Sequence, residues 1–449
     1  MTEELFPYQH TGAAFLAGRD RAALLDEMGL GKTAQAITAL DLNRLQRGIV
    51  VCPAAVREVW KGEFKKFSTQ QRKIIKGNST SDLGLWLRGK ADVLLLSYER
   101  ATLWASKLEG DLFDFLIFDE SHYMKSDEAQ RTRAMLGVKC DGAGGLARWA
   151  GHVWMLSGTP MPNDPADAWP MIRFMKGTPL DKGTFVRRYF KSWHGTFSSR
   201  QTPRQDMMPE LKQAFSSFSL RRTLRDAGID LPPIWLTTQT IDGDTREICD
   251  LLMQHPGLED AIVNAIQEGG LSFLDAEYIS TLRRLIAVAK APAFVDLMDE
   301  DLKNGMNKVV IMGWHTAGLE SMHLEFAMRG YDAVLLTGNT NETDRKTAVK
   351  RFQEDPACRI FIGNIKAAGT GITLTAASEI VMFELAWAPG DNAQALKRVH
   401  RIGQTDTVRA RIICLENTID ETVAEIVSRK TSSILMIEGT GVDVMEKLV

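Results

Sequence analysis

The sequence predicts an α/β fold, with two doubly wound parallel-sheet lobes and a mainly helical insert between them. Two series of short apolar runs alternate with longer polar or amphipathic stretches, which is typical of buried parallel strands and their covering helices. A segment that breaks this alternation separates the two series. At 449 residues the chain is also too long for one ordinary core, so more than one domain is expected.

The first lobe is expected over residues 1–170. Between its apolar runs lie stretches with the character of helices. The predicted strands are Ala22–Leu25, Gly48–Cys52, Val93–Ser97, Phe115–Phe118 and His152–Leu156. In such a sheet the functional loops lie at the carboxyl ends of the strands, so the residues that follow these runs are candidates for a site.

The second lobe is expected over residues 305–449. Its predicted strands are Lys308–Met312, Asp332–Leu336, Arg359–Ile362, Glu379–Phe383 and Ala410–Cys414. The residues between the lobes, 171–304, contain aromatic and basic clusters, the pair Pro232–Pro233 and helix-like stretches such as Ala276–Lys290. They predict a mainly helical insert together with the connection between the lobes.

The composition excludes several classes of protein. Hydrophobic residues make up 44% and charged residues 25%, which is ordinary for a globular chain, and the net charge of -3 gives no whole-chain basic signature. The acidic start MTEELFPYQH is unlike a signal peptide, and no apolar run approaches the length of a membrane span. Five cysteines without a C-x-x-C pair predict reduced thiols and no structural zinc. We therefore expect a cytoplasmic protein without a membrane partner.

A glycine-rich segment, Asp26–Thr33 (DEMGLGKT), follows the first apolar run and precedes Ala34–Leu40, a good helix former. Strand, glycine-rich turn and helix form the context of a phosphate loop, where backbone amides close around phosphate oxygens. Lys32 is expected to reach the β- and γ-phosphates, and Thr33 to hold Mg²⁺. The alternative is a chance Gly-Lys-Thr on a surface turn, and the generic loop pattern has glycine where this chain has Asp26.

An acidic pair follows the run Phe115–Phe118. Beside a phosphate loop, Asp119 is expected to bind Mg²⁺, and Glu120 to orient and deprotonate the attacking water. On its own such a pair is often a solvated turn, and the phosphate loop is what favours a function. The run Leu156–Pro160 (LSGTP) ends another strand. Its hydroxyls are suited to link the acids to a bound polymer, and an ordinary turn is the alternative.

The second lobe has two further candidate segments. Gly369–Thr375 (GTGITLT) is a loop rich in hydroxyl groups, which suits a sugar-phosphate backbone. Within Gln394–Gln404, Arg398 and Arg401 are spaced i and i+3, so that on a helix they share one face. Such a pair is suited to reach a γ-phosphate as arginine fingers, and the alternative is a solvated basic helix surface.

With these residues in place, the chain resembles the Swi/Snf-related family of double-stranded DNA translocases, within the superfamily-two helicase-like ATPases. The resemblance covers nearly the whole chain and implies two RecA-like lobes. Asp26–Thr33 matches the phosphate loop of that family, including Asp26. The other matching segments are Pro7–Gln9, Val51–Pro53, Asp119–His122, Leu156–Asn163, Leu220–Thr223, Trp387–Gly390 and Arg398–Gln404. The chain looks like a minimal motor, closer to the compact bacterial or viral members and to annealing-type translocases.

The resemblance implies ATP and Mg²⁺ as cofactors and assigns the site residues. The catalytic residues are expected to be Lys32, Asp119, Glu120, Arg398 and Arg401. The nucleotide-binding residues are expected to be Gln9, Met28, Gly29, Leu30, Gly31, Lys32, Thr33, Ala34, Gly371 and Gln394, with Gln9 contacting the adenine. The nucleic-acid contacts are expected to be Trp60, Thr159, Arg187, Arg188, Thr370 and Trp387. The basic region from Arg173 to Arg225 is expected to add DNA-facing surface, unless it is a solvated helical face.

The expected function is ATP-dependent translocation along double-stranded DNA, with hydrolysis in the cleft between the lobes. The partner is expected to be duplex DNA, bound by a monomeric motor without preference for a base sequence. Two alternatives stay open: a strand-separating DNA or RNA helicase, and a DNA-binding scaffold with weak ATPase activity. The intact Lys32, Asp119 and Glu120 argue against the scaffold.

Overall fold

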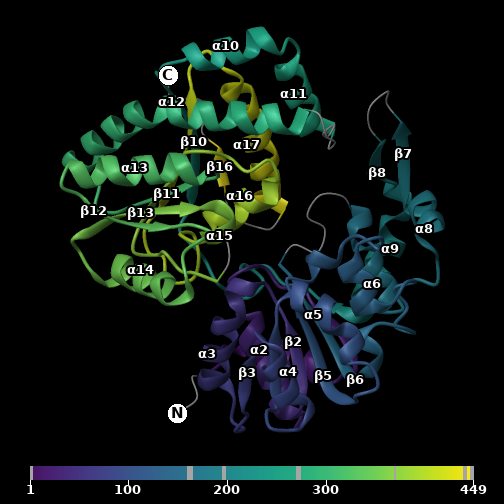
Figure 1. Ribbon diagram of the computed structural model, residues 1–449. Coiled ribbons are helices and arrows are strands. Elements are labelled where there is room, and N and C mark those ends of the chain that lie inside the picture. Colours follow the sequence, from purple (N-terminus) through teal and green to yellow (C-terminus); the bar gives the residue numbers. More distant parts are fainter. Residues whose placement is uncertain are drawn as a thin grey trace. The chain divides into compact units, whose positions relative to one another are not determined.

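The computed structural model describes residues 4–158, 165–194, 199–268, 275–368, 371–437 and 442–444. The chain divides into two compact units, of which the first contains Met1–Trp193 and Arg200–Gly228 and the second contains the rest. Each unit has a seven-stranded sheet, and all the recorded strand pairs of these two sheets are parallel (Figure 1). This confirms the predicted α/β class with two parallel-sheet lobes.

The first sheet has the strand order β3-β4-β2-β5-β6-β1-β9. Its strands are β1 (Arg21–Leu24), β2 (Gly48–Val51), β3 (Ile74–Lys76), β4 (Val93–Leu96), β5 (Phe113–Asp119), β6 (Ala150–Leu156) and β9 (Ser219–Leu220). The five strands predicted from apolar runs are all present, and β3 and β9 are additional strands at the two edges. A separate two-stranded sheet joins β7 (Phe190–His194) and β8 (Ser199–Pro203).

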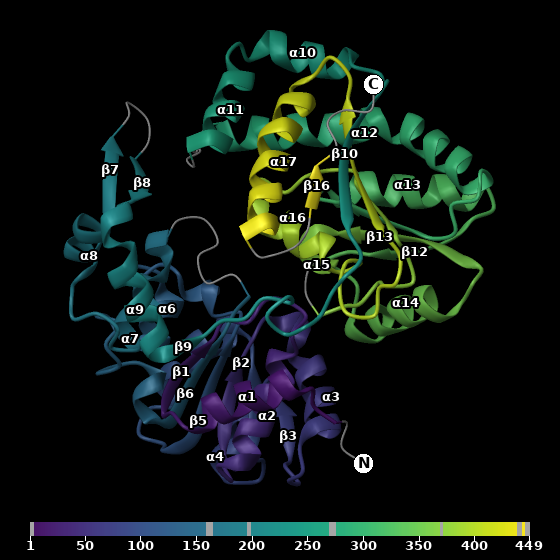
Figure 2. The same cartoon turned by 180° about the vertical axis from the view of Figure 1, so that it is seen from behind.

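Helices cover both faces of the first sheet (Figure 2). Buried residues of α1 (Pro7–Ala17), α2 (Lys32–Leu42) and α3 (Arg57–Phe67) join one core cluster. The core cluster on the other face includes buried residues of α4 (Thr80–Leu87), α5 (Tyr98–Trp104), α6 (Gln130–Leu136), α7 (Trp169–Phe174), α8 (Lys182–Tyr189) and α9 (Met208–Phe218). Short 3-10 helices are η1 (Ala54–Val56), η2 (Ala105–Lys107), η3 (Ser121–Met124), η4 (Leu146–Trp149), η5 (Pro165–Ala168) and η6 (Gln205–Met207).

The central strands β2 and β4 of the first sheet are apolar along their whole length because both faces are covered. Every residue of β2 and β4 is buried. Successive side chains of a strand point to opposite faces, so Leu94 and Leu96 join one core cluster while Val93 and Leu95 join the other. This double burial explains why the central strands appear in the sequence as continuous apolar runs.

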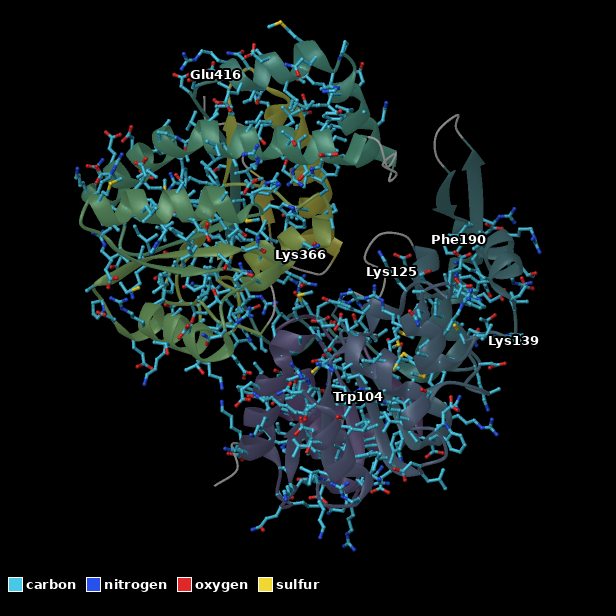
Figure 3. The ribbon with its side chains drawn as sticks, in the orientation of Figure 1. Trp104, Lys125, Lys139, Phe190, Lys366 and Glu416 are labelled. Carbon is cyan, nitrogen blue, oxygen red and sulfur yellow. The ribbon has the colours of Figure 1, made fainter. Side chains whose placement is uncertain are left out.

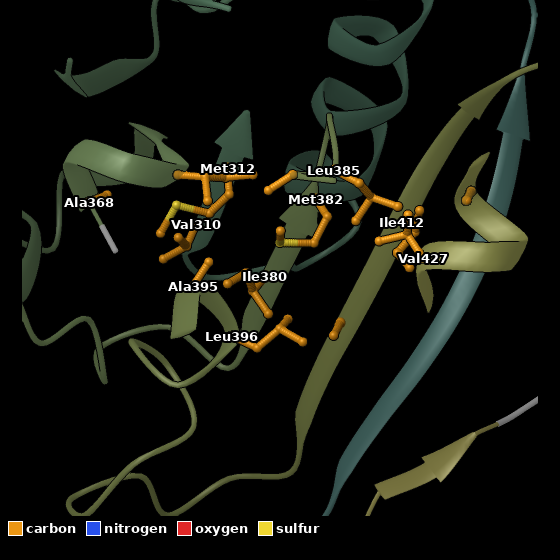
Figure 4. Close-up of a cluster of buried hydrophobic side chains, with 14 of the residues drawn as sticks. Val310, Met312, Ala368, Ile380, Met382, Leu385, Ala395, Leu396, Ile412 and Val427 are labelled. Atoms are coloured by element: carbon orange, nitrogen blue, oxygen red, sulfur yellow. The ribbon is translucent and has the colours of Figure 1, made fainter. Parts of the chain in front are cut away.

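The second sheet has the strand order β12-β13-β11-β14-β15-β10-β16. Its strands are β10 (Ile234–Ile241), β11 (Val309–Gly313), β12 (Asp332–Leu336), β13 (Cys358–Asn364), β14 (Glu379–Met382), β15 (Val408–Leu415) and β16 (Val442–Val444). The helices are α10 (Arg246–Gln254), α11 (Leu258–Glu268), α12 (Asp275–Lys303), α13 (Thr316–Met328), α14 (Glu342–Glu354), α15 (Ile365–Ala368), α16 (Pro389–Leu396) and α17 (Ile419–Ile437). Part of one of its core clusters, with Val310, Ile380 and Ile412, is drawn in Figure 4.

The residues expected as an insert, 171–304, contribute to both units. Helices α8 and α9 belong to the first unit, whereas β10, α10, α11 and α12 belong to the second. The expected boundaries of three domains stay a prediction. Across the described residues, no helix combines the length and the apolar character that a membrane crossing requires.

Candidate active site

The phosphate loop joins β1 to α2. Gly29 and Gly31 have φ angles of 91° and 70°, in the left-handed region that residues with a side chain rarely adopt. A Cβ atom on Gly31 would also lie 2.3 Å from Nε2 of Gln9. Gly31 directly precedes α2, whose first turn contains Thr33 and Ala34 and carries N–H groups without partners in the helix. The loop therefore has the backbone conformation and the positive helix end that suit a phosphate group.

Lys32 is the first residue of α2, and its amine turns back over the loop. Its Nζ donates hydrogen bonds to the carbonyl oxygens of Asp26 and Glu27, at 2.8 and 3.1 Å. Gly158, which follows β6, also lies against this loop: a Cβ atom there would be 2.6 Å from Cγ of Met28 and 3.5 Å from Nζ of Lys32. The phosphate loop and the motif after β6 therefore meet around the amine.

Three parallel strands of the first unit end at the same edge of the sheet. Leu24, at the end of β1, is in register with Leu156, at the end of β6. Leu156 is in turn in register with Asp119, the last residue of β5. Because functional loops of parallel sheets lie at these carboxyl ends, the register brings the phosphate loop and the acidic pair to one place.

Asp119 is buried, with 8% of its surface exposed, and both of its carboxylate oxygens accept hydrogen bonds. Oδ2 accepts from Nε1 of Trp60 at 2.7 Å, and Oδ1 accepts from the backbone N–H of Glu120 at 3.0 Å. The hydroxyl of Tyr98 donates to the Asp119 carbonyl at 2.9 Å. Burial, followed by the charge of Glu120, raises the pKa of Asp119 to about 6, while Trp60 and Lys32 act in the opposite direction. The structure thus places Lys32, Asp119 and Glu120 in one electrostatic environment.

Glu120 has φ and ψ angles of 52° and 50°, a left-handed conformation that is uncommon for a residue with a side chain. Strain of this kind is found preferentially at functional sites. Nδ1 of His122 lies 3.3 Å from Oε2 of Glu120 and 3.2 Å from Oγ of Ser157. His122 therefore connects the acidic pair to the start of the motif after β6. Thr159, predicted to contact nucleic acid, lies outside the described residues.

Gln9 lies on α1 directly beside the phosphate loop. Its Nε2 donates to the carbonyl of Leu30 at 3.3 Å, and its Oε1 accepts from the N–H of Phe6 at 3.0 Å. Phe6 and Tyr8 stack with ring centroids 5.9 Å apart. The residue predicted to contact adenine is thus in contact with the predicted phosphate-binding loop, although the two are far apart in the sequence.

The prediction that Trp60 contacts nucleic acid is wrong. Trp60 lies on α3 with 0% of its surface exposed, and its indole N–H donates to Asp119. A side chain without exposed surface has no area to offer a DNA backbone. Trp60 and Phe64 are spaced i and i+4 and are the buried residues of α3. That spacing is a sequence signal for the buried face of a helix.

In the second unit, the arginine segment and the hydroxyl-rich loop are in contact. Nη1 of Arg401 donates to the carbonyl of Ile372 at 3.1 Å, and the carbonyl of Arg398 accepts from the N–H of Leu374 at 2.9 Å. Nε of Arg398 donates to the carbonyl of Gln394 at 3.2 Å. α16 ends at Leu396 and a turn follows, so Arg398 and Arg401 do not share one face of a helix.

The same loop contains Gly371, which has a φ angle of 72° in the left-handed region. Gly371 is a predicted nucleotide-binding residue, and its neighbour Ile372 accepts the bond from Arg401. Thr370, predicted to contact nucleic acid, lies outside the described residues. Glycine at position 371 is thus required by the backbone that presents this loop to the arginine.

Trp387 belongs to a group of aromatic and cationic side chains that the sequence analysis did not identify as a cluster. The guanidinium of Arg283, on α12, lies 5.0 Å from the ring of Trp387 and 5.5 Å from that of Trp314. Nζ of Lys366, labelled in Figure 3, lies 4.8 Å from the ring of Trp314. Trp314 and Lys366 follow the ends of β11 and β13, so their position after strands was the signal that could have revealed them.

Some residues of the basic region that was expected to face DNA make hydrogen bonds or ion pairs within the protein. Arg188 on α8 makes two hydrogen bonds to Glu210, at 3.0 and 2.8 Å, and Arg187 donates to the hydroxyl of Thr184 at 2.9 Å. Both arginines are exposed. Arg222, by contrast, is paired with the fully buried Asp26, so its inclusion in that surface was wrong.

Comparison with known proteins decides the family. Residues 8–242, more than half of the chain, match the family model of the SNF2-related domain. The chain belongs to the SNF2-related family. Residues 289–403 match the helicase conserved C-terminal domain. Together the two matches give the domain pair of the helicase-like ATPases, which confirms the resemblance found in the sequence.

Several known proteins align with most of this chain. A SWI/SNF-related matrix-associated actin-dependent regulator of chromatin subfamily A-like protein 1 homolog of Caenorhabditis elegans is 30% identical over 441 residues, covering 96% of this chain and 61% of that protein. The DNA annealing helicase and endonuclease ZRANB3 of Homo sapiens is 29% identical, covering 95% and 40%. An ATP-dependent helicase of Mycoplasma pneumoniae is 26% identical, covering 94% and 41%. The chain therefore spans 40 to 61% of the length of these relatives.

A solved structure that aligns along the chain is the Sulfolobus solfataricus SWI2/SNF2 ATPase core in complex with dsDNA. It is 21% identical, covers 98% of this chain and 94% of that chain, and superposes with a TM-score of 0.45.

Proposed function

We propose that this SNF2-related ATPase hydrolyses ATP at the phosphate loop of the first unit and uses the energy to translocate along double-stranded DNA. The observation that carries the proposal is the register of β1, β6 and β5, which gathers Lys32, Asp119 and Glu120 at one sheet edge. Family membership supports the ATPase chemistry, and the names of several relatives refer to DNA or chromatin.

Each site residue of the first unit has a distinct role in this proposal. Lys32 neutralises charge on the β- and γ-phosphates, and Glu120 orients and deprotonates the attacking water. Thr33 and Asp119 hold Mg²⁺, and their hydroxyl and buried carboxylate are the hard oxygen ligands that this ion prefers. When bound, Mg²⁺ supplies positive charge to the phosphate oxygens. The remaining loop residues, from Met28 to Ala34, supply backbone amides, and Gln9 contacts the adenine.

The arginines of the second unit are proposed to complete the chemistry. Arg398 and Arg401 supply positive charge to the γ-phosphate in the transition state, which in related phosphoryl-transfer motors accelerates hydrolysis by a factor of about 10³ or more. Gly371 and Gln394 are proposed to bind nucleotide. The hydrogen bond from Arg401 to the Ile372 carbonyl supports this grouping, because it holds the arginine against the loop that contains Gly371.

Duplex DNA is the proposed track, gripped through its backbone. The cluster of Trp387, Trp314, Arg283 and Lys366 combines cations with flat rings, and cations supply most of the affinity for phosphates. Further proposed contacts are Thr159, Thr370, Arg187 and Arg188. Because backbone contacts carry no base information, a monomer of this chain is expected to bind without sequence preference.

The test compares ATP turnover without nucleic acid and with blunt duplex DNA, single-stranded DNA or RNA. Translocation is followed separately, by displacement of the third strand from a triplex, and unwinding by strand displacement from a fork. We expect the largest stimulation with duplex DNA, triplex displacement, and no fork unwinding. Lys32→Ala should abolish turnover with an unchanged melting temperature, whereas Lys139→Ala, at an exposed lysine of the same unit labelled in Figure 3, should leave turnover intact.

Two results would replace this proposal. Efficient strand displacement from the fork, or stronger stimulation by RNA than by duplex DNA, would make the protein a strand-separating helicase. Binding of duplex DNA with no measurable turnover, equal in the wild type and in Lys32→Ala, would make it a binding scaffold.

A further inference from the structure

The first residue of the phosphate loop, Asp26, is fully buried although it carries a charge. Its carboxylate meets the guanidinium of Arg222 on two sides: Nε lies 3.0 Å from Oδ1, and Nη2 lies 2.5 Å from Oδ2. Nε2 of Gln35, on α2, donates to Oδ2 at 3.1 Å. A buried carboxylate requires such partners, because its desolvation is costly. The departure from glycine at position 26 is thus matched by an arginine 196 residues later.

The segment that contains Arg222 runs alongside the first half of the loop. Leu220 ends β9, and its carbonyl accepts from the N–H of Leu25 at 2.7 Å. The Arg222 carbonyl then accepts from the N–H of Glu27 at 2.8 Å, and Oε2 of Glu27 accepts from the N–H of Leu224 at 2.8 Å. The backbone of residues 25–27 is therefore fixed by the chain segment that ends the first unit at Gly228.

The same guanidinium also reaches α1 and α2. Nη1 of Arg222 donates to the carbonyl of Tyr8, and Nη2 donates to Oε1 of Gln35 at 2.8 Å. Nε2 of Gln35 in turn donates to the carbonyl of Leu30, near the end of the loop, at 2.9 Å. A Cβ atom on Gly12 would lie 1.8 Å from Oε1 of Gln35 and 2.7 Å from Nη2 of Arg222, so this contact needs glycine on α1. Arg222 and Gln35 together thus join both ends of the phosphate loop to the helix that carries Gln9.

From this geometry we propose that Arg222 is a positioning residue of the ATP site, which holds the phosphate loop and α1 together in the conformation that binds ATP. The inference rests on the proposed ATPase function of the loop. Arg222 acts through Asp26, Gln35 and Tyr8 and does not itself touch the nucleotide. The planar guanidinium presents several N–H donors in a fixed geometry to these acceptors, whereas lysine has a single amine.

The chain offers a matched control for the loss of a buried ion pair. Arg72 and Asp41 form a pair with side chains 1% and 8% exposed, at a distance of 2.5 Å, comparable to the 12% and 0% of Arg222 and Asp26. Arg72 also bonds to Ser68 and to the Leu45 carbonyl, and it has no recorded contact with the phosphate loop. Arg72→Met and Arg222→Met therefore remove similar buried pairs at different places in the same unit.

The experiment measures ATP KM and kcat of the full chain at saturating duplex DNA, together with the melting temperature. Arg222→Met should raise the ATP KM by about tenfold or more, as expected for the loss of a hydrogen bond to a charged group, with a smaller change in kcat. Arg222→Lys, which is more conservative, should fold and show an intermediate KM. Arg72→Met should lower the melting temperature as much as Arg222→Met does, but should leave the ATP KM within about twofold of the wild type, the scatter expected at a site without coupling to the loop.

A double variant tests whether Arg222 acts through Asp26. If it does, Asp26→Asn should raise the ATP KM on its own, and Asp26→Asn with Arg222→Met should be no worse than Arg222→Met alone. If the ATP KM were unchanged in Arg222→Lys and Arg222→Met, or rose equally in Arg72→Met, the Arg222–Asp26 pair would contribute only to folding. These measurements require a wild type that hydrolyses ATP. If the wild type showed no turnover, the proposed ATPase function would be overturned. The positioning role of Arg222 would then be tested by measuring ATP binding to the same variants directly.

Discussion

Replacing Trp60 with Phe removes one hydrogen bond from the acidic end of β5. The indole donates to the carboxylate of Asp119 at 2.7 Å, with both groups buried. Trp154 is an internal control: it has 0% exposure in the same core cluster, and its indole donates to the neutral carbonyl of Arg19 at 2.9 Å. Hydrogen bonds to charged groups contribute about 1.5–3 kcal/mol and neutral ones about 0.5–1.5 kcal/mol. Since both substitutions remove the same ring volume, Trp60→Phe should cost about 1–1.5 kcal/mol more than Trp154→Phe.

The assay combines stability with catalysis. Urea unfolding followed by circular dichroism gives the free energy of unfolding, and ATP turnover is titrated with Mg²⁺ at saturating duplex DNA. Trp60→Phe should lower turnover and raise the Mg²⁺ concentration needed for half of the maximal rate, because Asp119 loses the side-chain donor that orients it. Trp154→Phe should change only stability. Equal unfolding free energies and equal Mg²⁺ requirements in the two variants would refute the role assigned to Trp60.

Two other predictions concern the second unit. Arg401→Ala should lower ATP turnover by about 10³-fold with little change in duplex affinity. Arg409→Ala, at an exposed arginine paired with Glu379, should leave ATP turnover unchanged. Loss of DNA binding with retained turnover in Arg401→Ala would place Arg401 on the DNA. Burial works to raise the pKa of Glu384, but the hydrogen bonds and charge of His315 outweigh it and hold that pKa below its usual range. This stabilisation is present above the ordinary carboxyl pKa and is lost as the pH falls through the folded value, so urea unfolding of Glu384→Gln should show a weaker acid dependence than the wild type.

The sequence predicted the central strands of both sheets because strands covered on two faces are apolar throughout. Strands β9 and β10 lack this signature, whereas the edge strand β12 was predicted from its own apolar run. β9 has only two residues, and β10 has several partly buried or exposed positions, so neither forms an apolar run. That Arg398 and Arg401 act as a pair stays a prediction, and a spacing of i and i+3 occurs in turns as well as in helices. The end of α16 at Leu396 depends on the fold around it.

The residues of the candidate site could be predicted where they directly follow strands. Contacts between residues far apart in the sequence could not be predicted. The positions of Lys32, Asp119 and Glu120 follow from motif order and from the geometry of parallel sheets. The pairing of Asp26 with Arg222 has no local pattern, because 196 residues separate the two. Arg222 also lies in a stretch of basic residues, which favoured a surface position that the structure does not give it.

The order in which a ribosome makes the chain differs from the order of the strands in the first sheet. β1 is synthesised early and β6 can pair with one of its edges once Leu156 has appeared, but β9, which covers the other edge, emerges only after α9. Until then the nascent chain exposes an unpaired strand edge and a carboxylate without its arginine. Late contacts of this kind slow folding and favour aggregation. The first unit can therefore complete its fold only after the residues up to Leu224 have left the ribosome, when part of the second unit has already been made.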